Sequence, residues 1–283
     1  MLTAPDTANR MRISFLVSET AFKTITPIKL FILFYYRHIH AATVKDANVS
    51  SHRRYSIAVT LKLLYTFSGL FPHTTSKDGL SFMIKNVIFD IGNVLVDFSW
   101  KEHMIENGFS GECISVLTKN MVQHPLWDEL DLGIRPHTEV IADMKALSPE
   151  YAAQIDQYFS DPMGIIRPRA HSVPLIASLK DRGFGVYLLS NYPGWLFELH
   201  SPGFGFMDLV DGMVVSSYVK VMKPDSEIYR ILLDKYSLNP AECVFLDDRR
   251  ENTEAAERLG IRSILCAEQE QFERELEEII SGQ

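Results

Sequence analysis

Residues 86–97 read NVIFDIGNVLVD, an apolar run that stops abruptly at a carboxylate. The β-branched and aromatic residues at its start predict a short buried strand, and Asp90 follows that strand directly. In an open parallel α/β sheet, ligands bind outside the carboxyl ends of the strands. Asp90 is therefore a candidate site residue, although a lone carboxylate after a strand is more often a turn or capping residue.

From Met83 onward, the chain alternates short β-branched runs with segments of helical periodicity. This alternation predicts an α/β fold with a Rossmann-like parallel sheet covered by helices. The predicted strands are 86–90, 185–190, 213–216, 243–247 and 262–266, and the predicted helices are 172–182, 225–236, 250–259 and 269–280. Gly183 and Gly260 stand where helices are expected to end.

The stretch 98–169 interrupts this pattern, because it has helix-period apolar residues and no convincing strand. We expect an inserted helical cap there, with a catalytic core formed by 83–97 and 170–283. Residues 1–82 show no core pattern and are expected to be a poorly structured extension or the product of a mis-assigned start. The apolar runs 28–36 and 56–71 are too short, or too interrupted by Lys62, to predict a membrane span.

Composition excludes several functional classes. The chain has 283 residues, 46% hydrophobic and 23% charged, as expected of a globular protein. Its net charge of -8 combines a basic first part with an acidic body, so nucleic acid is not expected as a partner, and neither is a membrane. Three scattered cysteines form no disulfide framework, which favours a reducing compartment, the cytoplasm.

Polar residues also follow three further predicted strands. Ser190 and Asn191 end one, Lys223 stands just before a helix, and Asp247 and Asp248 end another. Adjacent carboxylates repel each other unless exposure or a cation relieves them. Oxygen ligands without a matching set of His and Cys favour Mg²⁺ over zinc.

These motifs together resemble the haloacid dehalogenase superfamily over essentially all of 83–283. They occur in the family's order, as FDIGNVLVD, LLSN, KPD and DDRREN, and the helical insert resembles the cap of its subfamily I. Four ordered motifs are far more specific than one strand-end aspartate. The FDIGNV pattern resembles a sub-branch that includes sugar-phosphate phosphatases such as α-glucose-1-phosphate phosphatase.

The resemblance implies a role for each motif residue. Asp90 would attack phosphorus to form an aspartyl-phosphate, and Lys223 would offset charge between this nucleophile and the phosphate. The transferring phosphoryl oxygens would be held by Ser190, Asn191 and Asn93. Mg²⁺ would be coordinated by Asp90, the Gly92 carbonyl and Asp248, with support from Asp247. The implied partner is a small phosphorylated molecule.

One departure from the family pattern concerns proton transfer. Many phosphatases of this family carry a second Asp two positions after the nucleophile, and Gly92 stands there instead. A phosphatase would then need another proton donor, for which the cap residues His103, His124 and His137 are candidates. Two alternatives remain, namely a 2-haloacid dehalogenase, which needs neither that proton nor Mg²⁺, and a non-catalytic binding protein.

Two tryptophans are candidate substrate-binding residues. The segment 124–133, HPLWDELDLG, is the expected substrate selector of the cap, with Trp127 offering a flat face to the substrate. Trp195 lies shortly after Ser190 and Asn191 and is expected at the mouth of the pocket. A Trp at the helical spacing of Trp127 from Leu130 is more often a core residue, and Trp195 is equally compatible with simple packing.

Overall fold

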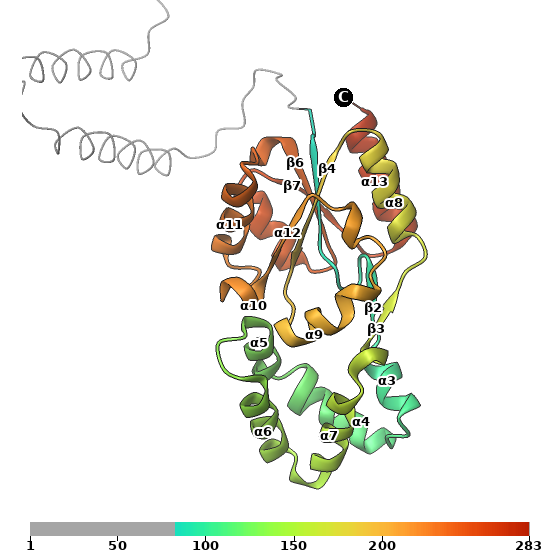
Figure 1. Cartoon of the computed structure of the whole chain (residues 1–283), viewed down its shortest axis with the longest axis vertical. Helices are drawn as coiled ribbons and strands as arrows, with labels where there is room; N and C mark the ends of the chain where they lie inside the picture. Colours follow the sequence, from blue (N-terminus) through green and yellow to red (C-terminus); the bar gives the residue numbers. More distant parts are fainter. Residues whose placement is uncertain (1–82, 283) are drawn as a thin grey trace, which may run out of the picture. The chain divides into compact units, whose positions relative to one another are not determined.

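The computed structural model describes residues 83–282, and its centre is a five-stranded parallel sheet (Figure 1). The strand order is β5-β4-β1-β6-β7, and β1 occupies the middle. The strands are β1 (Asn86–Phe89), β4 (Gly185–Ser190), β5 (Gly212–Val215), β6 (Cys243–Asp247) and β7 (Arg262–Leu265). The predicted α/β class with a parallel sheet is therefore confirmed.

The strand order reverses beside β1, which is where open α/β sheets place their ligands. β1 pairs with β4 on one side and with β6 on the other, and Phe89 stands opposite both Leu188 and Leu246. The main-chain N–H of Asp90 also donates to the Leu246 carbonyl at 2.9 Å. This register brings the residues that follow β1, β4 and β6 to the same edge of the sheet.

Two pairs of helices cover the two faces of the sheet (Figure 1). Apolar residues of α8 (Ser172–Asp181) and α13 (Gln269–Ser281) pack on one face, against β-strand residues such as Val87 and Val244. Those of α11 (Ser226–Tyr236) and α12 (Arg250–Glu257) pack on the other, against Ile88 and Phe245. β1 and β6 are almost fully buried as a result, which explains their continuous apolar sequences.

A tight turn follows Asp90 and leads into a second, two-stranded sheet. The Ile91 carbonyl accepts hydrogen bonds from the N–H groups of Leu95 and Val96, and Asn93 adopts a left-handed φ of 55°. Asn tolerates this conformation better than most residues. The turn enters β2 (Val96–Phe98), which pairs antiparallel with β3 (Ile166–Pro168).

The expectation of no strand within 98–169 is wrong at its end, where β3 lies. Three residues are too few to show an alternation of apolar and polar side chains, and Pro168 argues against a strand in sequence. The pairing with β2 supplies the hydrogen bonds that define it, and this partner lies about 70 positions away in the chain.

Between β2 and β3, residues 99–165 form a helical bundle with a hydrophobic core of its own (Figure 1). Its main helices are α3 (Trp100–Glu106), α4 (Gly111–Leu117), α5 (Pro125–Leu132), α6 (His137–Leu147) and α7 (Ala152–Ser160), with a π-helical turn at Thr118–Val122. Fully buried side chains such as Leu117, Met144 and Tyr158 come from different helices and pack together.

Element boundaries differ from expectation by one or two residues. The strand expected at 213–216 begins one residue earlier, and Asp225 is the N-cap of α11, where its side chain accepts from the Glu227 N–H. Gly183 and Gly260 have left-handed φ values of 86° and 83°, and Gly183 directly follows the C-cap of α8. Within residues 83–282, no helix is long and apolar enough to cross a membrane. The expectations for 1–82 concern residues outside the described part.

Candidate active site

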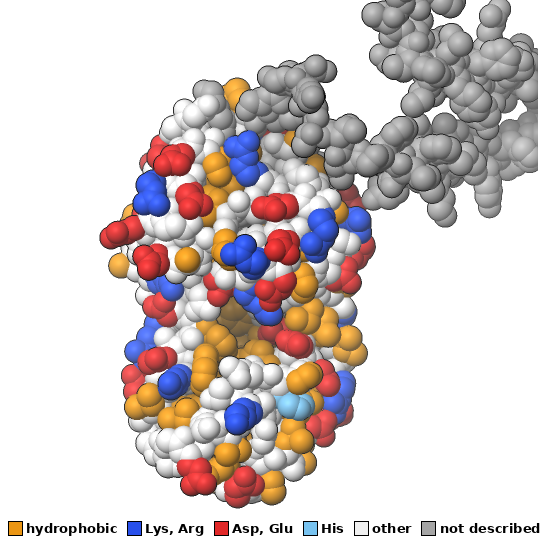
Figure 2. Space-filling view, turned by 180° about the vertical axis from the view of Figure 1, so that it is seen from behind, with side chains coloured by type: hydrophobic (Ala, Val, Ile, Leu, Met, Phe, Trp, Pro, Cys, Tyr) orange, Lys and Arg blue, Asp and Glu red, His pale blue; other side chains and the backbone are white. Residues whose placement is uncertain are grey.

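A cavity of about 220 Å³ lies between the carboxyl edge of the sheet and the helical bundle. The surface is hollowed there, with hydrophobic side chains inside and charged ones beside them (Figure 2). Its lining on the sheet side includes the strand-end residues Asp90, Gly92, Asn93, Asn191, Lys223, Asp248, Arg249 and Asn252. Four chain segments that are remote in sequence thus converge on one space.

A buried ion-pair triad stands at the centre of this edge. The Lys223 ammonium lies 2.9 Å from Asp90 Oδ1 and 2.6 Å from Asp247 Oδ2. Lys223 is 1% exposed and Asp247 is fully buried, so both charges depend on each other for compensation. Burial opposes the charge of Lys223, but the two carboxylates overcome it and raise its pKa, which keeps the ammonium charged.

Both carboxylate oxygens of Asp247 accept hydrogen bonds within the protein. Its Oδ1 accepts from the Arg249 N–H and from Asn252 Nδ2, both at 2.9 Å, while its Oδ2 contacts Lys223. Asp247 therefore holds Lys223 in place next to Asp90. Its neighbour Asp248 is less buried and lines the cavity.

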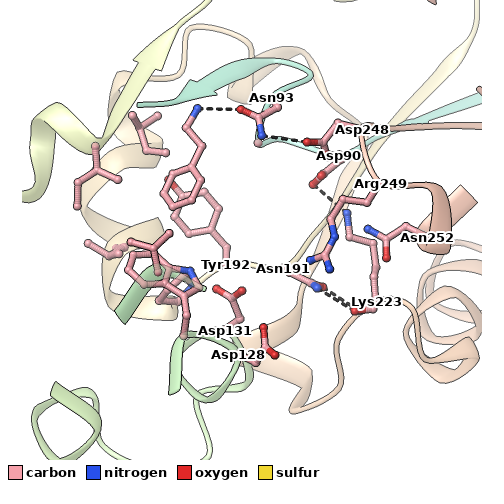
Figure 3. Close-up of a pocket in the computed structure, with 18 of the residues that line it drawn as sticks. Asp90, Asn93, Asp128, Asp131, Asn191, Tyr192, Lys223, Asp248, Arg249 and Asn252 are labelled. Atoms are coloured by element: carbon pink, nitrogen blue, oxygen red, sulfur yellow. Dashed lines mark hydrogen bonds and ion pairs between the residues drawn. The ribbon is translucent and has the colours of Figure 1, made fainter. Parts of the chain in front are cut away.

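The three carboxylates provide a site that suits a divalent cation. One oxygen each from Asp90, Asp247 and Asp248 lies within 4.8 Å of the others. In the hydrogen bonds of residues 83–282, Asp90 uses only Oδ1 and Asp248 only Oδ2, which accepts from Asn93 Nδ2 at 2.9 Å (Figure 3). The second oxygen of both residues remains for an ion, and hard oxygen donors are what Mg²⁺ prefers.

Burial and the neighbouring carboxylates disfavour the charged form of Asp90. Burial raises the pKa of Asp90 to about 7, and the charges of Asp247 and Asp248 act in the same direction, against the lowering effect of Lys223. One ammonium thus compensates three carboxylates only in part. Burial likewise raises the pKa of Asp248. A cation between Asp90 and Asp248 would restore both to their charged forms.

Asn191 and Ser190 differ in what they present to the cavity. The Asn191 side chain accepts from the Lys223 N–H at 2.8 Å and donates to the Lys223 carbonyl at 3.0 Å, so it anchors the backbone of Lys223 (Figure 3). Ser190 is 1% exposed and its hydroxyl lies 3.5 Å from the Asn191 carbonyl. Asn191 lines the cavity, whereas Ser190 lies behind the lining.

The bundle and the segments beside it form the opposite wall, which is mostly apolar. Its lining includes Phe98, Val122, Trp127, Ile165, Ile166, Tyr192, Pro193 and Leu196. Two carboxylates of α5, Asp128 and Asp131, project from this wall (Figure 3). The predicted selector segment 124–133 thus reaches the cavity through Trp127 and these two aspartates.

Asp128 and Asp131 are the site residues that sequence reasoning missed. The signal was present, since Asp131 follows Trp127 by four positions and therefore shares its face of the helix. Asp131 is 8% exposed, and its burial raises the pKa of its carboxyl well above the ordinary range, with the charges of Asp128 and Asp90 adding to the effect. Asp128 is exposed.

Several expected residues lie outside the cavity. Trp195 lines a separate hollow, where its ring stacks on His137 with centroids 4.7 Å apart. His103 is buried against Tyr158 in the bundle, and His124 caps α5 by accepting from the Leu126 N–H. The structure therefore does not bring Trp195 or any of the three candidate histidines to Asp90.

Residues 84–260 match the family described as haloacid dehalogenase-like hydrolases. With the parallel sheet and the strand-end residues in place, this chain belongs to the haloacid dehalogenase-like hydrolase family and is a hydrolase. The expected family membership is thus confirmed. Membership of the sub-branch that includes α-glucose-1-phosphate phosphatase is not confirmed.

Two similar proteins are phosphatases by name. The sesquiterpene phosphatase astK of Aspergillus oryzae is 28% identical over 181 residues, which are 62% of this chain and 87% of that protein. The putative phosphatase YhcW of Bacillus subtilis is 24% identical, over 65% of this chain and 83% of that protein. Other relatives are longer, and the chain spans 37% of the drimenol cyclase drtB of Aspergillus calidoustus.

Solved structures of this family share the fold. A HAD family enzyme of Bacteroides thetaiotaomicron, solved in complex with magnesium and inorganic phosphate, superposes with a TM-score of 0.52 at 22% identity, over 64% of this chain and 93% of that one. The L-2-haloacid dehalogenase RSc1362 superposes with a TM-score of 0.51 at 16% identity, over 64% of this chain and 86% of that one.

Proposed function

We propose that this hydrolase is a Mg²⁺-dependent phosphatase that acts on a small phosphomonoester through an aspartyl-phosphate on Asp90. The observation that carries the proposal is the cluster of Asp90, Asp247 and Asp248 around one buried ammonium at the carboxyl edge of the sheet. The similarity to the phosphatases astK and YhcW supports the same reaction.

Asp90, Asp248 and the Gly92 carbonyl would hold Mg²⁺, which supplies positive charge to the phosphoryl oxygens when it is bound. Asp247 supports the site through Lys223, because its own oxygens are occupied. Lys223 lies between the nucleophile and Asp247, where its charge compensates the phosphate that approaches Asp90.

The phosphoryl group would be held from the sheet side. The side-chain amide of Asn191 is used to anchor Lys223, so we assign phosphate binding to the main-chain N–H of Asn191, with the Ser190 hydroxyl beneath it. Asn93 orients Asp248 and belongs to the same cradle. We further propose that residues 98–169 act as a cap over a core of 83–97 and 170–283.

The alternatives have less support. Halide displacement from a 2-haloacid needs no cation, and the carboxylate cluster would then leave a buried negative charge without a function. The likeness to dehalogenases is one of fold, at 15 to 17% identity in the structures compared. A binding protein without catalysis has no chemical reason to retain Asp90 beside Lys223 together with the carboxylates of Asp247 and Asp248.

The lining of the cavity favours a substrate with an apolar body. Phe98, Ile166 and Leu196 offer no hydrogen bonds to a sugar, whose buried hydroxyl groups each need a partner. An isoprenoid-like phosphomonoester fits this wall, in line with the sesquiterpene phosphatase astK. A sugar phosphate, suggested by the FDIGNV motif, is the second candidate. The three described cysteines are buried and unpaired, which supports our proposal of a cytoplasmic location.

The test is phosphate release by the full chain from a panel that contains prenyl phosphates, sugar phosphates, nucleotides and p-nitrophenyl phosphate, with and without Mg²⁺. We expect turnover that requires both Mg²⁺ and Asp90, and Asp90→Asn should be inactive. A preference for prenyl over sugar phosphates would support a substrate with an apolar body. Halide release from 2-haloacids without a metal, with no phosphate release, would contradict the proposal.

A further inference from the structure

The proposed reaction requires a proton at the leaving oxygen. When Asp90 attacks phosphorus, the electron pair of the ester P–O bond passes to the alcohol oxygen, which is a poor leaving group unless it is protonated. The turn after Asp90 offers no such group, because Gly92 has no side chain. The proton therefore has to come from elsewhere in the cavity.

The glycine at this position is not required by the fold. A Cβ atom added at Gly92 would meet nothing within 4 Å, and Gly92 is not among the residues with positive φ. The backbone at this position would therefore accept a residue with a side chain. The fold thus does not require glycine at position 92. A proton donor on another element would make a carboxylate at this position unnecessary.

Most titratable groups of the cavity are unsuited to the task. Lys223 is locked between two carboxylates, and Arg249, which is held by Glu251, does not release a proton at ordinary pH. His200 contacts the Pro162 carbonyl through Nε2, and its Nδ1 accepts from the Tyr192 hydroxyl at 2.8 Å. The Tyr192 and His200 side chains are thus hydrogen-bonded to each other. Burial also raises the pKa of Tyr192 far above the physiological range.

Asp131 is the buried carboxyl group of the opposite wall. It lies on α5 and lines the same cavity as Asp90 and Trp127 (Figure 3). Its backbone is fixed to the core, because Ser216 Oγ donates to the Asp131 carbonyl at 2.5 Å and accepts from the Tyr192 N–H at 3.0 Å. The Asp131 carboxyl thus shares the cavity into which a substrate bound at Asp90 would extend its leaving group.

Burial also favours the neutral form of the Asp131 carboxyl. It raises the pKa of the Asp131 carboxyl well above its ordinary value, and the charges of Asp128 and Asp90 reinforce this effect against Lys223 and Arg249. A neutral carboxyl can donate a proton, and general acids in enzymes are commonly tuned in this way. Asp128 lies one turn away on the same helix and is exposed.

We propose that Asp131 is the proton donor and acceptor of this phosphatase, a role that rests on the proposed function. In the first step the Asp90–phosphorus bond forms, the ester P–O bond breaks, and the departing oxygen takes the proton of Asp131. In the second step Asp131, now a carboxylate, accepts a proton from water as the water oxygen bonds to phosphorus. The Asp90–phosphorus bond breaks, its electron pair returns to Asp90, and inorganic phosphate leaves.

The test compares the full-length wild type with Asp131→Asn on two esters, an alkyl phosphate and p-nitrophenyl phosphate. General acid catalysis contributes about 10² to 10⁴ in rate, so kcat for the alkyl ester should fall by this factor with little change in KM. Nitrophenolate leaves without a proton. The variant should therefore release a burst of one equivalent of nitrophenolate and then turn over slowly, because water activation is lost.

Two further variants sharpen the comparison. Asp143→Asn removes an exposed carboxylate of α6 that lies outside the cavity and pairs with Arg135, and kcat should stay within about tenfold of the wild type, since such exposed groups contribute little. Adding Gly92→Asp to Asp131→Asn places a carboxyl in the open space beside Asp90 and should restore the alkyl ester rate at least tenfold. The burst distinguishes a chemical role from misfolding, because misfolded protein gives none.

Equal losses on both esters without a burst, or equal behaviour of Asp131→Asn and Asp143→Asn, would overturn the role of Asp131. Failure of the proposed function gives a different pattern. In that case the wild type releases no phosphate from either ester, or Asp90→Asn remains as active as the wild type. Activity that depends on Asp90 but survives in Asp131→Asn contradicts the role of Asp131 alone.

Discussion

Lys223 shows how one side chain connects stability and chemistry. Its ammonium is the only cation in contact with the fully buried Asp247 among residues 83–282, at 2.6 Å, and it also reaches Asp90. Removing one partner of a buried pair leaves an uncompensated charge, which is strongly unfavourable. The residue proposed to bind phosphate is thus equally required to fold the site.

We therefore expect Lys223→Met to reduce the free energy of unfolding by about 3 to 5 kcal/mol at pH 7, and to abolish phosphate release. Urea denaturation followed by circular dichroism measures the first effect. Adding Asp247→Asn should recover part of the lost stability without restoring activity. Equal stability of the wild type and Lys223→Met would show that the pair is not coupled as described.

A second prediction at the residue scale concerns Asp131 and the pH dependence of the stability of the fold. The folded-state pKa of Asp131 is raised well above the ordinary value of 3.8, so the folded state binds more protons than the unfolded state above pH 4. Stability then falls as pH rises through that range, by up to about 1.4 kcal/mol per pH unit. Asp131→Asn should consequently be more stable than the wild type at pH 7 and similar to it near pH 4.

Thermal unfolding of both proteins between pH 4 and pH 8 measures this difference. A constant gap between the wild type and Asp131→Asn would mean that Asp131 ionises normally in the folded protein.

At the scale of elements, α5 is attached to the core by a short chain of hydrogen bonds. Ser216 is the N-terminal residue of α10 (Ser216–Val219), and its hydroxyl bridges the Asp131 carbonyl of α5 and the Tyr192 N–H that follows β4. All three groups are buried. This bridge positions Asp131 relative to the strand ends.

Ser216→Ala leaves a buried carbonyl and a buried N–H without a partner, each worth about 1 to 3 kcal/mol. We expect faster hydrogen exchange at the Tyr192 amide and in α5, with reduced activity. The neighbouring Ser217 hydroxyl is buried without a hydrogen-bond partner in the structure, so Ser217→Ala is the matched control and should be neutral or stabilising. Equal effects of both substitutions would argue against the bridge.

Sequence predicted the elements of the sheet well and the bundle wall poorly. Residues 86–90 and 243–247 are apolar throughout because both faces of the sheet are covered, and their terminal carboxylates meet because parallel strands share an edge. Trp195 was misplaced because its contact with His137 depends on how α6 packs, which local periodicity does not encode. The two hydrogen bonds between the Asn191 side chain and the Lys223 backbone likewise depend on tertiary packing.

At the scale of the whole molecule, the unbalanced carboxylates predict that Mg²⁺ stabilises the fold. A ligand that binds only the folded state adds RT ln(1 + [L]/Kd), or about 2.7 kcal/mol at a hundredfold excess over Kd. The melting temperature of the wild type should rise with Mg²⁺ and fall on chelation. Asp248→Asn removes a cavity-facing ligand and should respond much less, as differential scanning fluorimetry would show; an equal response would place the ion elsewhere.

The β2–β3 ladder has a consequence for how such proteins diversify. Phe98 and Ile166 are register partners in this ladder, so the two ends of the helical bundle emerge side by side. About 5 Å separates paired Cα atoms in an antiparallel ladder, a gap that a two-residue hairpin turn also bridges. Recombination at this single seam can therefore exchange or shorten the bundle while the strand order of the main sheet and the residues at its strand ends stay unchanged.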